Sequence, residues 1–526
     1  MSESVSSPNR QIFRAAGVVM FGMALSSVIG LITTILITRT FGTQSDINAY
    51  FAANRLTEIL FVLVSGGALA SAYLPTFTGF LTRGDLRGAW RMASAVANLV
   101  LLILVLACGI AWIFAPWVVD HILAPGFSDT GQIELTVSLL RIMLITPILF
   151  GMSGLLMATL QAHQNFILPA LAPAAYRLGM ILGIFLFVPK WGIYGLAWGV
   201  VLGTCMHLII QIPGLRGKGA TYSRTLGLDD PAVAEVGRLM LPRLLGVAVV
   251  QINFLVNTNL ASRMAEGSVS ALTYAFALMI MPQAIIAQAI AIAALPTFSA
   301  QVALGQLKGM RDALAATLRG VVFLAFPATV GLILLRREIV GALFERGLFD
   351  SQSTELVAWA LLWFAAGLLG HSLLEVVSRA FYALHDTRTP VLVGVGAMSL
   401  NVLLSILFSL AFLRLGRAPI GGLALANSLA TAIEATVLLW LIHRRFGGMD
   451  LRAQRRGITA IILASSAMAV TIIIWLALTG DQSVWISGGV GIVLGGAVYW
   501  LVALLLGVPD AKEIPGAIFK RGGADA

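Results

Sequence analysis

The chain has 526 residues, of which 59% are hydrophobic and only 11% are charged, and its formal net charge is +10. A soluble domain carries far more charge. Because apolar runs of about 18 or more residues recur along the chain, the composition predicts a polytopic α-helical membrane protein. The positive charge follows from membrane topology, as shown below, and does not indicate nucleic-acid binding. Cys108 and Cys205 both fall inside apolar runs, so neither a disulfide framework nor a metal site is expected.

Fourteen transmembrane spans are predicted from the apolar runs. The first run is too long for the apolar core of a signal peptide and is kept as a helix. An even number of spans places both termini on the same side of the membrane. The predicted spans cover residues 14–38, 49–74, 91–115, 135–160, 169–188, 192–212, 238–261, 270–294, 317–335, 355–382, 390–413, 420–442, 457–479 and 484–507.

The distribution of Lys and Arg supports this topology. With the N-terminus in the cytoplasm, 22 of the 34 Lys and Arg residues fall on cytoplasmic segments and adjoining helix ends, 8 on outer loops and 4 within spans. Cytoplasmic segments of membrane proteins are enriched in these residues. The bias therefore predicts a multi-pass protein of the cytoplasmic (inner) membrane, with both termini in the cytoplasm.

An internal repeat divides the chain. The motif Leu74-Pro75-Thr76-Phe77 recurs 221 residues later, and the same offset relates Gly126 to Gly347, Asp129 to Asp350 and Pro169 to Pro390. Six spans separate equivalent points, so the two copies are parallel and related by an axis along the membrane normal. We predict an N-terminal lobe (residues 1–215, helices 1–6), a C-terminal lobe (230–445, helices 7–12) and an extra helix pair (457–507, helices 13–14). Two such lobes suggest alternating access to a central cavity.

The seventh span is polar on one half of its helical wheel. It carries Arg243, Gln251, Asn253 and Asn257, which share that half at about 100° per residue. Polar groups are costly in hydrocarbon, so this half is expected to line a water-filled cavity. The alternative is that these side chains hydrogen-bond neighbouring helices.

Arginines inside the spans are candidates for binding an anion, because a guanidinium offers paired donors to phosphate. Arg141 lies nearer an outer helix end, where it can snorkel to the interface. The predicted substrate-binding residues are Arg55, Arg177, Arg243, Gln251, Asn253 and Asn257.

The chain offers no motif for catalysis or for a cofactor. The Gly217-Lys218-Gly219 stretch lacks the spacing and the hydroxyl of a P-loop, no His-Glu-x-x-His motif occurs, and the histidines are scattered. We therefore expect neither an enzyme nor a cofactor.

Away from the span ends, three acidic residues lie inside the spans: Glu58, Glu375 and Glu434. Glu375 lies four residues before Arg379, and Glu58 lies three residues after Arg55, so both are interpreted as members of local ion pairs. A proton relay is the alternative for both Glu375 and Glu58.

Several stretches together resemble the MurJ (MviN) lipid II flippase family of the MOP transporter superfamily. The stretches are Ser27–Leu31 with Phe41-Gly42, Leu123–Thr130, Leu245–Val247 with Gln251–Asn253, Leu295–Phe298, and Phe381–Pro390, of which the last is the most specific. The resemblance implies an alternating-access flippase that moves a lipid-linked cell-wall precursor, an undecaprenyl-pyrophosphate-linked molecule like lipid II, to the outer leaflet for peptidoglycan synthesis. It further implies a cationic cavity for the headgroup and a groove at the last two helices for the lipid tail. The expected partners are this anionic substrate and membrane lipids, with no nucleic acid, and the protein is expected to act as a monomer.

The chain departs from the family pattern where the family carries cavity charges. Ser27 stands where the family usually has Arg, Thr33-Thr34 where it has Arg-Asp, Asn48 where it has Asp, Phe61 where it has Arg, and Phe276-Ala277 where it has Asp-Arg. Arg55, Gln251 and Asn253 match family positions, and Arg177 and Arg243 are candidates to replace the lost cations.

These departures keep other functions open. A related transporter of the same superfamily, either a polysaccharide-lipid flippase or a multidrug exporter, is the nearest alternative. A polytopic glycosyltransferase or wall polymerase would need an acidic cluster on an outer loop. Asp350 and Glu355 offer the only suggestion of one, and we interpret them as part of a solvated loop. A membrane scaffold is the third alternative.

Overall fold

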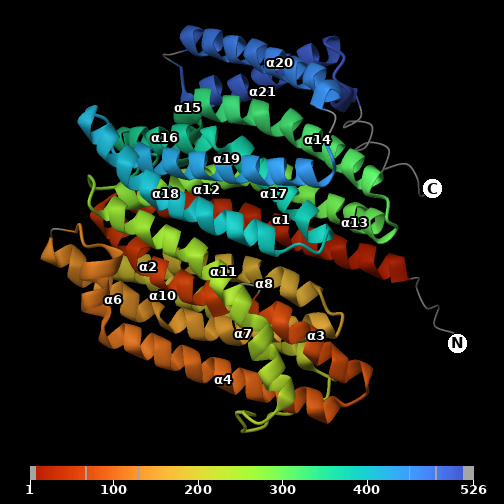
Figure 1. The fold of residues 1–526 in the computed structure, drawn as a ribbon. Coiled ribbons are helices and arrows are strands. Elements are labelled where there is room, and N and C mark those ends of the chain that lie inside the picture. The colour runs from red at the N-terminus through yellow and green to blue at the C-terminus, as the bar shows by residue number, and fades with distance from the viewer. Residues whose placement is uncertain (1–7, 65–67, 128, 449–450, 480–481, 513–526) are drawn as a thin grey trace, which may run out of the picture. The chain divides into compact units, whose positions relative to one another are not determined.

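A computed structural model describes residues 8–64, 68–127, 129–448, 451–479 and 482–512. Over these ranges the chain is helical and contains no strand, as the sequence predicts (Figure 1). The chain forms two compact units, Met1–Val269 and Ser270–Ala526.

The first unit is built around long, closely packed helices. Within it α1 packs on α8, α2 on α6 and α7, α8 on α10, and α11 on α2 and α3. The helices are α1 (Pro8–Phe41), α2 (Ser45–Val64), α3 (Ala68–Thr82), α4 (Leu86–Ile113), α5 (Ala115–Val118), the π-helical turn η1 (Val119–Leu123), α6 (Thr130–Met143), α7 (Ile145–Ala162), α8 (Ile167–Leu186), α9 (Val188–Trp191), α10 (Ile193–Ile209), the short 3₁₀-helix η2 (Ile212–Leu215) and α11 (Pro231–Ser262).

The second unit repeats much of this order and adds a pair of helices at its end. Here α18 packs on α19, α17 on α19 and α14, and α20 on α14 and α21. The helices are α12 (Ser268–Gln283), the π-helical turn η3 (Ala284–Gln288), α13 (Ala289–Ala303), α14 (Leu307–Leu334), α15 (Arg336–Phe344), α16 (Ser351–Ala366), α17 (Leu368–Ala383), α18 (Arg388–Arg414), α19 (Ile420–Arg445), α20 (Leu451–Leu478) and α21 (Val484–Leu505).

The described residues contain eleven helices that are long and apolar enough to cross a membrane, or twelve if the bent pair α16–α17 is one span. The other two predicted spans are 49–74, which includes residues outside the described set, and 238–261, in which some side chains are not described. The first of them corresponds to α2 and α3, and the second lies within α11. The count is thus consistent with the fourteen spans expected.

The helix boundaries carry the repeat that the sequence motifs indicate. The helices α13, α14, α15, α16 and α18 begin 221 positions after α3, α4, α5, α6 and α8, respectively. Among the described residues, Gln164 and His385 are the two non-glycine positions with positive φ, at 59° and 58°, and they are separated by the same offset. The division into lobes at residues 215 and 230 stays a prediction, since the two compact units divide between Val269 and Ser270 and the first unit includes α11.

The repeated motifs have local structural roles. Asp129 caps the N-terminus of α6 by accepting from the Gly131 N–H, and Asp350 caps α16 by accepting from the Ser353 N–H. A side-chain acceptor at this position satisfies a backbone donor that the helix leaves free. Pro75 and Pro296 lie inside α3 and α13. The repeated Asp and Pro residues therefore mark the same turns and the same irregular helices in each copy.

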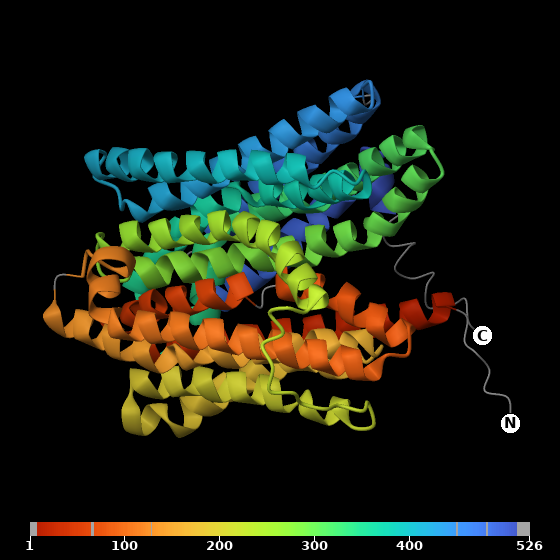
Figure 2. The same cartoon turned by 60° about the horizontal axis from the view of Figure 1, so that its bottom comes forward.

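The linker after η2 is held against α4 and is not a free tether (Figure 2). The Trp90 indole N–H donates to the Lys218 carbonyl at 3.1 Å, and the Asn98 amide donates to the carbonyls of Ser223 and Thr225 at 3.1 and 2.8 Å. These bonds satisfy backbone groups that a segment without regular structure leaves free.

The helix pair α20–α21 packs on α14 and α15. The Tyr499 hydroxyl donates to the Phe323 carbonyl at 2.6 Å, and Arg319 Nε lies 2.9 Å from Asp510 Oδ2 just beyond α21. On α21, Cβ atoms built at Gly488 and Gly495 would clash with Glu338 and Ile472, so these glycines permit close packing.

Candidate functional site

Arg55 on α2 is held against α11 in the first unit. Its Nε donates to the Thr258 hydroxyl at 3.2 Å, and its Nη1 lies 2.8 Å from Glu58 Oε2. The guanidinium also lies 5.2 Å from the centre of the Phe254 ring. Its side chain is 16% exposed whereas that of Glu58 is 45% exposed, so the positive charge is positioned firmly and is neutralised by an accessible partner.

The polar face of α11 includes a row of buried amides. Gln251, Asn253 and Asn257 are all buried, and the Asn257 side-chain amide donates to Asn253 Oδ1 at 3.1 Å. Gln251 Oε1 has no hydrogen-bond partner among the described residues. The predicted polar half of this helix is thus shielded from solvent, and it is partly satisfied by bonds along the helix itself.

Arg177 lies at the contact between α8 and α1. A Cβ at Gly30 of α1 would lie 3.6 Å from Arg177 Nε, so the glycine makes room for the guanidinium. Earlier on α1, a Cβ at Gly22 would meet Ala170, which is also earlier on α8. The contacts therefore advance in the same order along both helices, so α1 and α8 run in the same direction. In the described part of the chain, no acidic side chain pairs with Arg177 and no acceptor receives its hydrogen bonds. Its charge is therefore available to an anion.

Tyr176 brings the two arginine regions into one part of the unit. Its hydroxyl lies within electrostatic range of both Arg177 and Glu58, and Glu58 is the ion-pair partner of Arg55. The Tyr176 ring stands edge-on to the Phe150 ring, with ring centroids 5.2 Å apart. The centroids of the Phe150 and Phe61 rings are 4.5 Å apart. Aromatic packing between α8, α7 and α2 fixes this arrangement.

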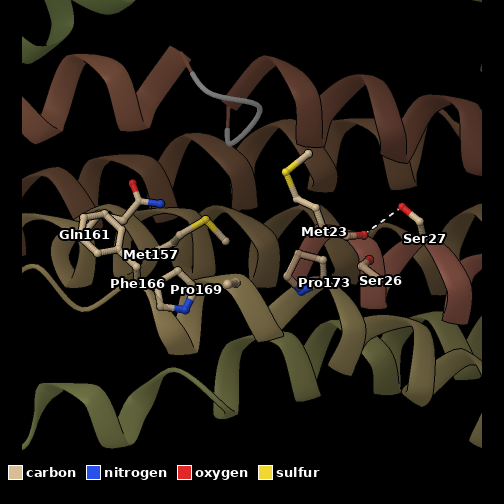
Figure 3. A pocket seen from close by; sticks show the side chains of 9 residues that line it. Met23, Ser26, Ser27, Met157, Gln161, Phe166, Pro169 and Pro173 are labelled. Carbon is tan, nitrogen blue, oxygen red and sulfur yellow. Dashed lines mark hydrogen bonds between the residues drawn. The ribbon is translucent and has the colours of Figure 1, made fainter. Parts of the chain in front are cut away.

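A cavity of about 340 Å³ lies between α1, α7 and α8. Figure 3 shows Met23 and Ser26 of α1 near Pro173 of α8, and Met157 of α7 near Pro169 of α8. Pro173 lies one helical turn before Arg177 on α8. The cavity is therefore mainly apolar, has a few hydroxyl and amide groups, and lies one turn from an unneutralised guanidinium.

Three side chains of this region were not singled out from the sequence: Thr258, Tyr176 and Gln161. Thr258 follows Asn257 directly, and Tyr176 precedes Arg177, so proximity to a predicted site residue was the available signal. Gln161 carried no signal, because its neighbours in space come from other helices. The prediction for Arg243 lies outside the described residues: its backbone is part of α11, but its side chain is not described.

At several positions where the family usually has charged residues, this chain has uncharged polar side chains that donate hydrogen bonds to nearby backbone carbonyls. Thr33 donates to the Ile29 carbonyl at 2.7 Å and Thr34 to the Gly30 carbonyl at 3.0 Å. The Asn48 amide donates to the carbonyls of Thr43 and Gln44. These bonds explain how uncharged residues occupy the positions without leaving unpaired groups.

Both intrahelical ion pairs interpreted from the sequence are present. Arg55 pairs with Glu58, and Arg379 pairs with Glu375 through Nη1 and Oε2. Arg141 lies over the Trp112 ring at 4.6 Å, an arrangement suited to a helix end. No group of acidic, histidine or cysteine residues suited to a metal occurs in the described ranges.

Comparison with known proteins identifies relatives along nearly the whole chain. The family model described as "Lipid II flippase MurJ" matches residues 37–506. A probable lipid II flippase MurJ from Vibrio cholerae is 30% identical over 519 residues, covering 94% of this chain and 96% of the relative. A lipid II flippase MurJ from Burkholderia cenocepacia is 29% identical and covers 76% of this chain and 78% of the relative.

Solved structures share the fold. A structure of lipid II flippase MurJ in an inward closed conformation matches with a TM-score of 0.80 and 24% identity, covering 93% of this chain and 98% of that one. An inward-facing multidrug resistance transporter of the MATE family, in the MOP superfamily, matches with a TM-score of 0.69 and 15% identity over 80% of this chain and 94% of that one.

Proposed function

This chain belongs to the lipid II flippase MurJ family, and we propose that it moves a lipid II-like precursor from the cytoplasmic to the outer leaflet for peptidoglycan synthesis. The family match over residues 37–506 carries this proposal. The many membrane-spanning helices provide the required setting, since a polar headgroup crosses hydrocarbon only inside a protein cavity.

Arg177 is assigned the main contact with the pyrophosphate. Its fork of donors matches phosphate oxygens, and no acid neutralises it in the described part of the chain. Arg55 is assigned a second contact, made when phosphate displaces the accessible Glu58. The proposed site also includes Arg243 and three residues that are buried in this structure, Gln251, Asn253 and Asn257. The mainly apolar cavity between α1, α7 and α8 suits the first part of the lipid chain.

We further infer an orientation with both termini in the cytoplasm. We further propose that residues 1–215 and 230–445 act as the two lobes of an alternating-access cycle. The parallel order of their helices supports this assignment. A reporter that is active only in the cytoplasm is expected to be active when it is fused after residue 526. A reporter that is active only outside the cytoplasm is expected to be inactive at the same position.

Complementation provides the cellular test. A bacterial strain depleted of its only lipid II flippase is expected to grow when it expresses this chain, and to stop growing when it expresses the Arg177→Ala variant at the same membrane level. Failure of the well-expressed wild-type chain to support growth in several hosts would contradict lipid II as the substrate.

The loss of several family cations leaves one other candidate, a multidrug exporter of the same superfamily. The shared fold with a MATE transporter is compatible with this candidate. The family model that matches this chain, however, describes a lipid II flippase and not an exporter of drugs. An exporter predicts altered drug resistance and no rescue of the depleted strain, so the same experiment separates the two functions.

A further inference from the structure

Glu434 on α19 is an acidic side chain buried in the second unit without compensation. The residue is 8% exposed, and its Oε2 has no hydrogen-bond partner among the described residues. A Cβ at Gly394 of α18 would lie 3.1 Å from Glu434 Oε1, so the carboxyl group is packed directly against the neighbouring helix. An isolated carboxylate in such surroundings is very costly, whereas a protonated carboxyl group costs much less.

Glu375, the other acidic residue of this region, has partners that compensate its negative charge. Glu375 on α17 pairs with Arg379 and accepts a hydrogen bond from the Gln283 amide at 3.3 Å. Its negative charge is therefore matched by a cation on the same helix face. Glu434 receives no comparable partner in the described residues, although it acts electrostatically on the same hydroxyl of Tyr382 as Glu375 and Arg379 do.

The elements packed on α19 are α16, α17 and α18. Of the titratable groups on α16 and α18, Glu355 pairs with Arg337, and Arg388 and Arg414 lie in the first and last turns of α18. His371 on α17 contacts Asn427, about two turns from Glu434 along α19. The charged and titratable side chains to be considered around Glu434 are Glu355, His371, Glu375, Arg379, Tyr382, Arg388 and Arg414, with His443, Arg444 and Arg445 at the end of α19 itself.

From this geometry we propose that Glu434 is a proton-binding site of the second unit and that it gains and loses its proton during the transport cycle. In the described state one Glu434 oxygen holds the proton as a neutral carboxyl group. Release forms the carboxylate and transfers the proton to water, with no other bond made or broken. The ionised form needs hydration or a cation, so release requires the α18–α19 contact to open.

The proton-binding part is independent of the substrate, whereas the coupling part rests on the proposed function. Infrared difference spectra of the purified full chain, recorded for wild type against Glu434→Gln at neutral pH, test the first part. The expected difference contains the carbonyl stretch of a protonated carboxyl group. The Glu58→Gln variant, in which an ion-paired acid is removed, is expected to change only carboxylate bands. A purely carboxylate difference for Glu434→Gln would overturn the site.

Two glycine variants give a matched check of the geometry. Gly394→Ala places a methyl group against the Glu434 carboxyl group, whereas a Cβ at Gly396, two residues further on α18, meets open space. The protonated carboxyl band is expected to shift in Gly394→Ala and to stay unchanged in Gly396→Ala. Equal spectra for both variants would contradict the placement of the proton on Glu434.

Flipping in proteoliposomes tests the coupling. The Glu434→Gln variant mimics the neutral form permanently, so its rate is expected to fall about tenfold or more and to lose any response to an imposed pH gradient. A wild-type rate with an unchanged pH response in this variant would overturn the coupling. If the wild-type chain does not flip lipid II, the proposed function fails, and the spectra still decide the proton site.

Discussion

Arg177 and Arg55 are both intramembrane cations, but their charges are balanced differently. Arg55 is bound by Thr258 and by Glu58, so an incoming phosphate must compete with a carboxylate. Arg177 lies over Gly30 and has no acidic partner among the described residues. The positive potential of the first unit's site is therefore concentrated at Arg177.

The Arg177→Ala variant is expected to weaken headgroup binding more than Arg55→Ala does. A charge-assisted contact is worth about 1.5–3 kcal/mol, which corresponds to a loss of roughly ten- to a hundredfold. Arg177→Lys is expected to recover only part of the loss, because the charge remains and the fork is lost. Binding of lipid II to the purified variants measures this order. Equal binding by wild type and both Ala variants, at equal folding, would contradict the cationic site.

Asp386 supports the turn between α17 and α18. The Thr389 backbone N–H, the Thr389 hydroxyl and Arg445 together hold the pKa of the Asp386 carboxyl below its usual range. In the unfolded chain the pKa of Asp is about 3.9. A lowered folded pKa stabilises the protein above that value, and the stabilisation is lost as the pH falls through the folded pKa.

The Asp386→Asn variant is therefore expected to be less stable at pH 7 by up to about 1 kcal/mol, because the charge that pairs with Arg445 is lost, and to show a weaker loss of stability below about pH 4. Thermal unfolding in detergent at both pH values measures the difference. The exposed acid Asp312, next to Arg311, provides the control: Asp312→Asn is expected to behave as wild type. Identical pH profiles for wild type and Asp386→Asn would remove this role.

At the scale of elements, α20 and α21 are fixed to the second unit at one end by a charged contact. Asp510 has a side chain that is only 8% exposed and pairs with Arg319 of α14. Gly489 and Gly496, by contrast, face open space on α21. Ile492 and Val493 of α21 are also exposed, so the outer face is apolar and suits contact with lipid, while the lipid-facing groove stays a prediction.

The Asp510→Asn variant is expected to lower the stability of this contact by about 1–3 kcal/mol, because a nearly buried charged hydrogen bond is lost. Faster protease cleavage between residues 445 and 457 and a lower unfolding temperature measure the effect. The control is Glu355→Gln, since the Arg337–Glu355 pair is exposed on both sides and such pairs contribute little. Equal losses in the two variants would contradict an anchoring role for Asp510.

Elements were more predictable than side-chain contacts. Hydropathy located the helices because a membrane segment must be apolar over its whole length, and the repeat followed from Pro and Asp residues that have local roles at helix interiors and caps. The ion pairs of Glu58 and Glu375 were predictable because their partners are three or four residues away. The contact of Arg55 with Thr258 was not, because it joins residues 203 positions apart. Likewise, no periodicity indicates that α1 runs beside α8.

At the scale of the whole molecule, the two compact units carry different polar groups. The first unit holds the arginines assigned to the headgroup, and the second holds the buried carboxyl group of Glu434. A flippase needs both a site for its substrate and a source of directionality, and we assign these tasks to separate units. The α20–α21 pair stands outside the repeat and is assigned to the lipid tail.

Direct flipping of lipid II is the measurement that tests the central claim. Purified full-length chain is reconstituted into vesicles with fluorescent lipid II in the inner leaflet, and the fraction that reaches the outer leaflet is followed over time. We expect wild type to move lipid II faster than empty vesicles, and Arg177→Ala, at equal incorporation, to lose most of this activity. Transfer no faster than in empty vesicles, by protein that is folded and correctly inserted, would contradict the assignment of this chain as a lipid II flippase.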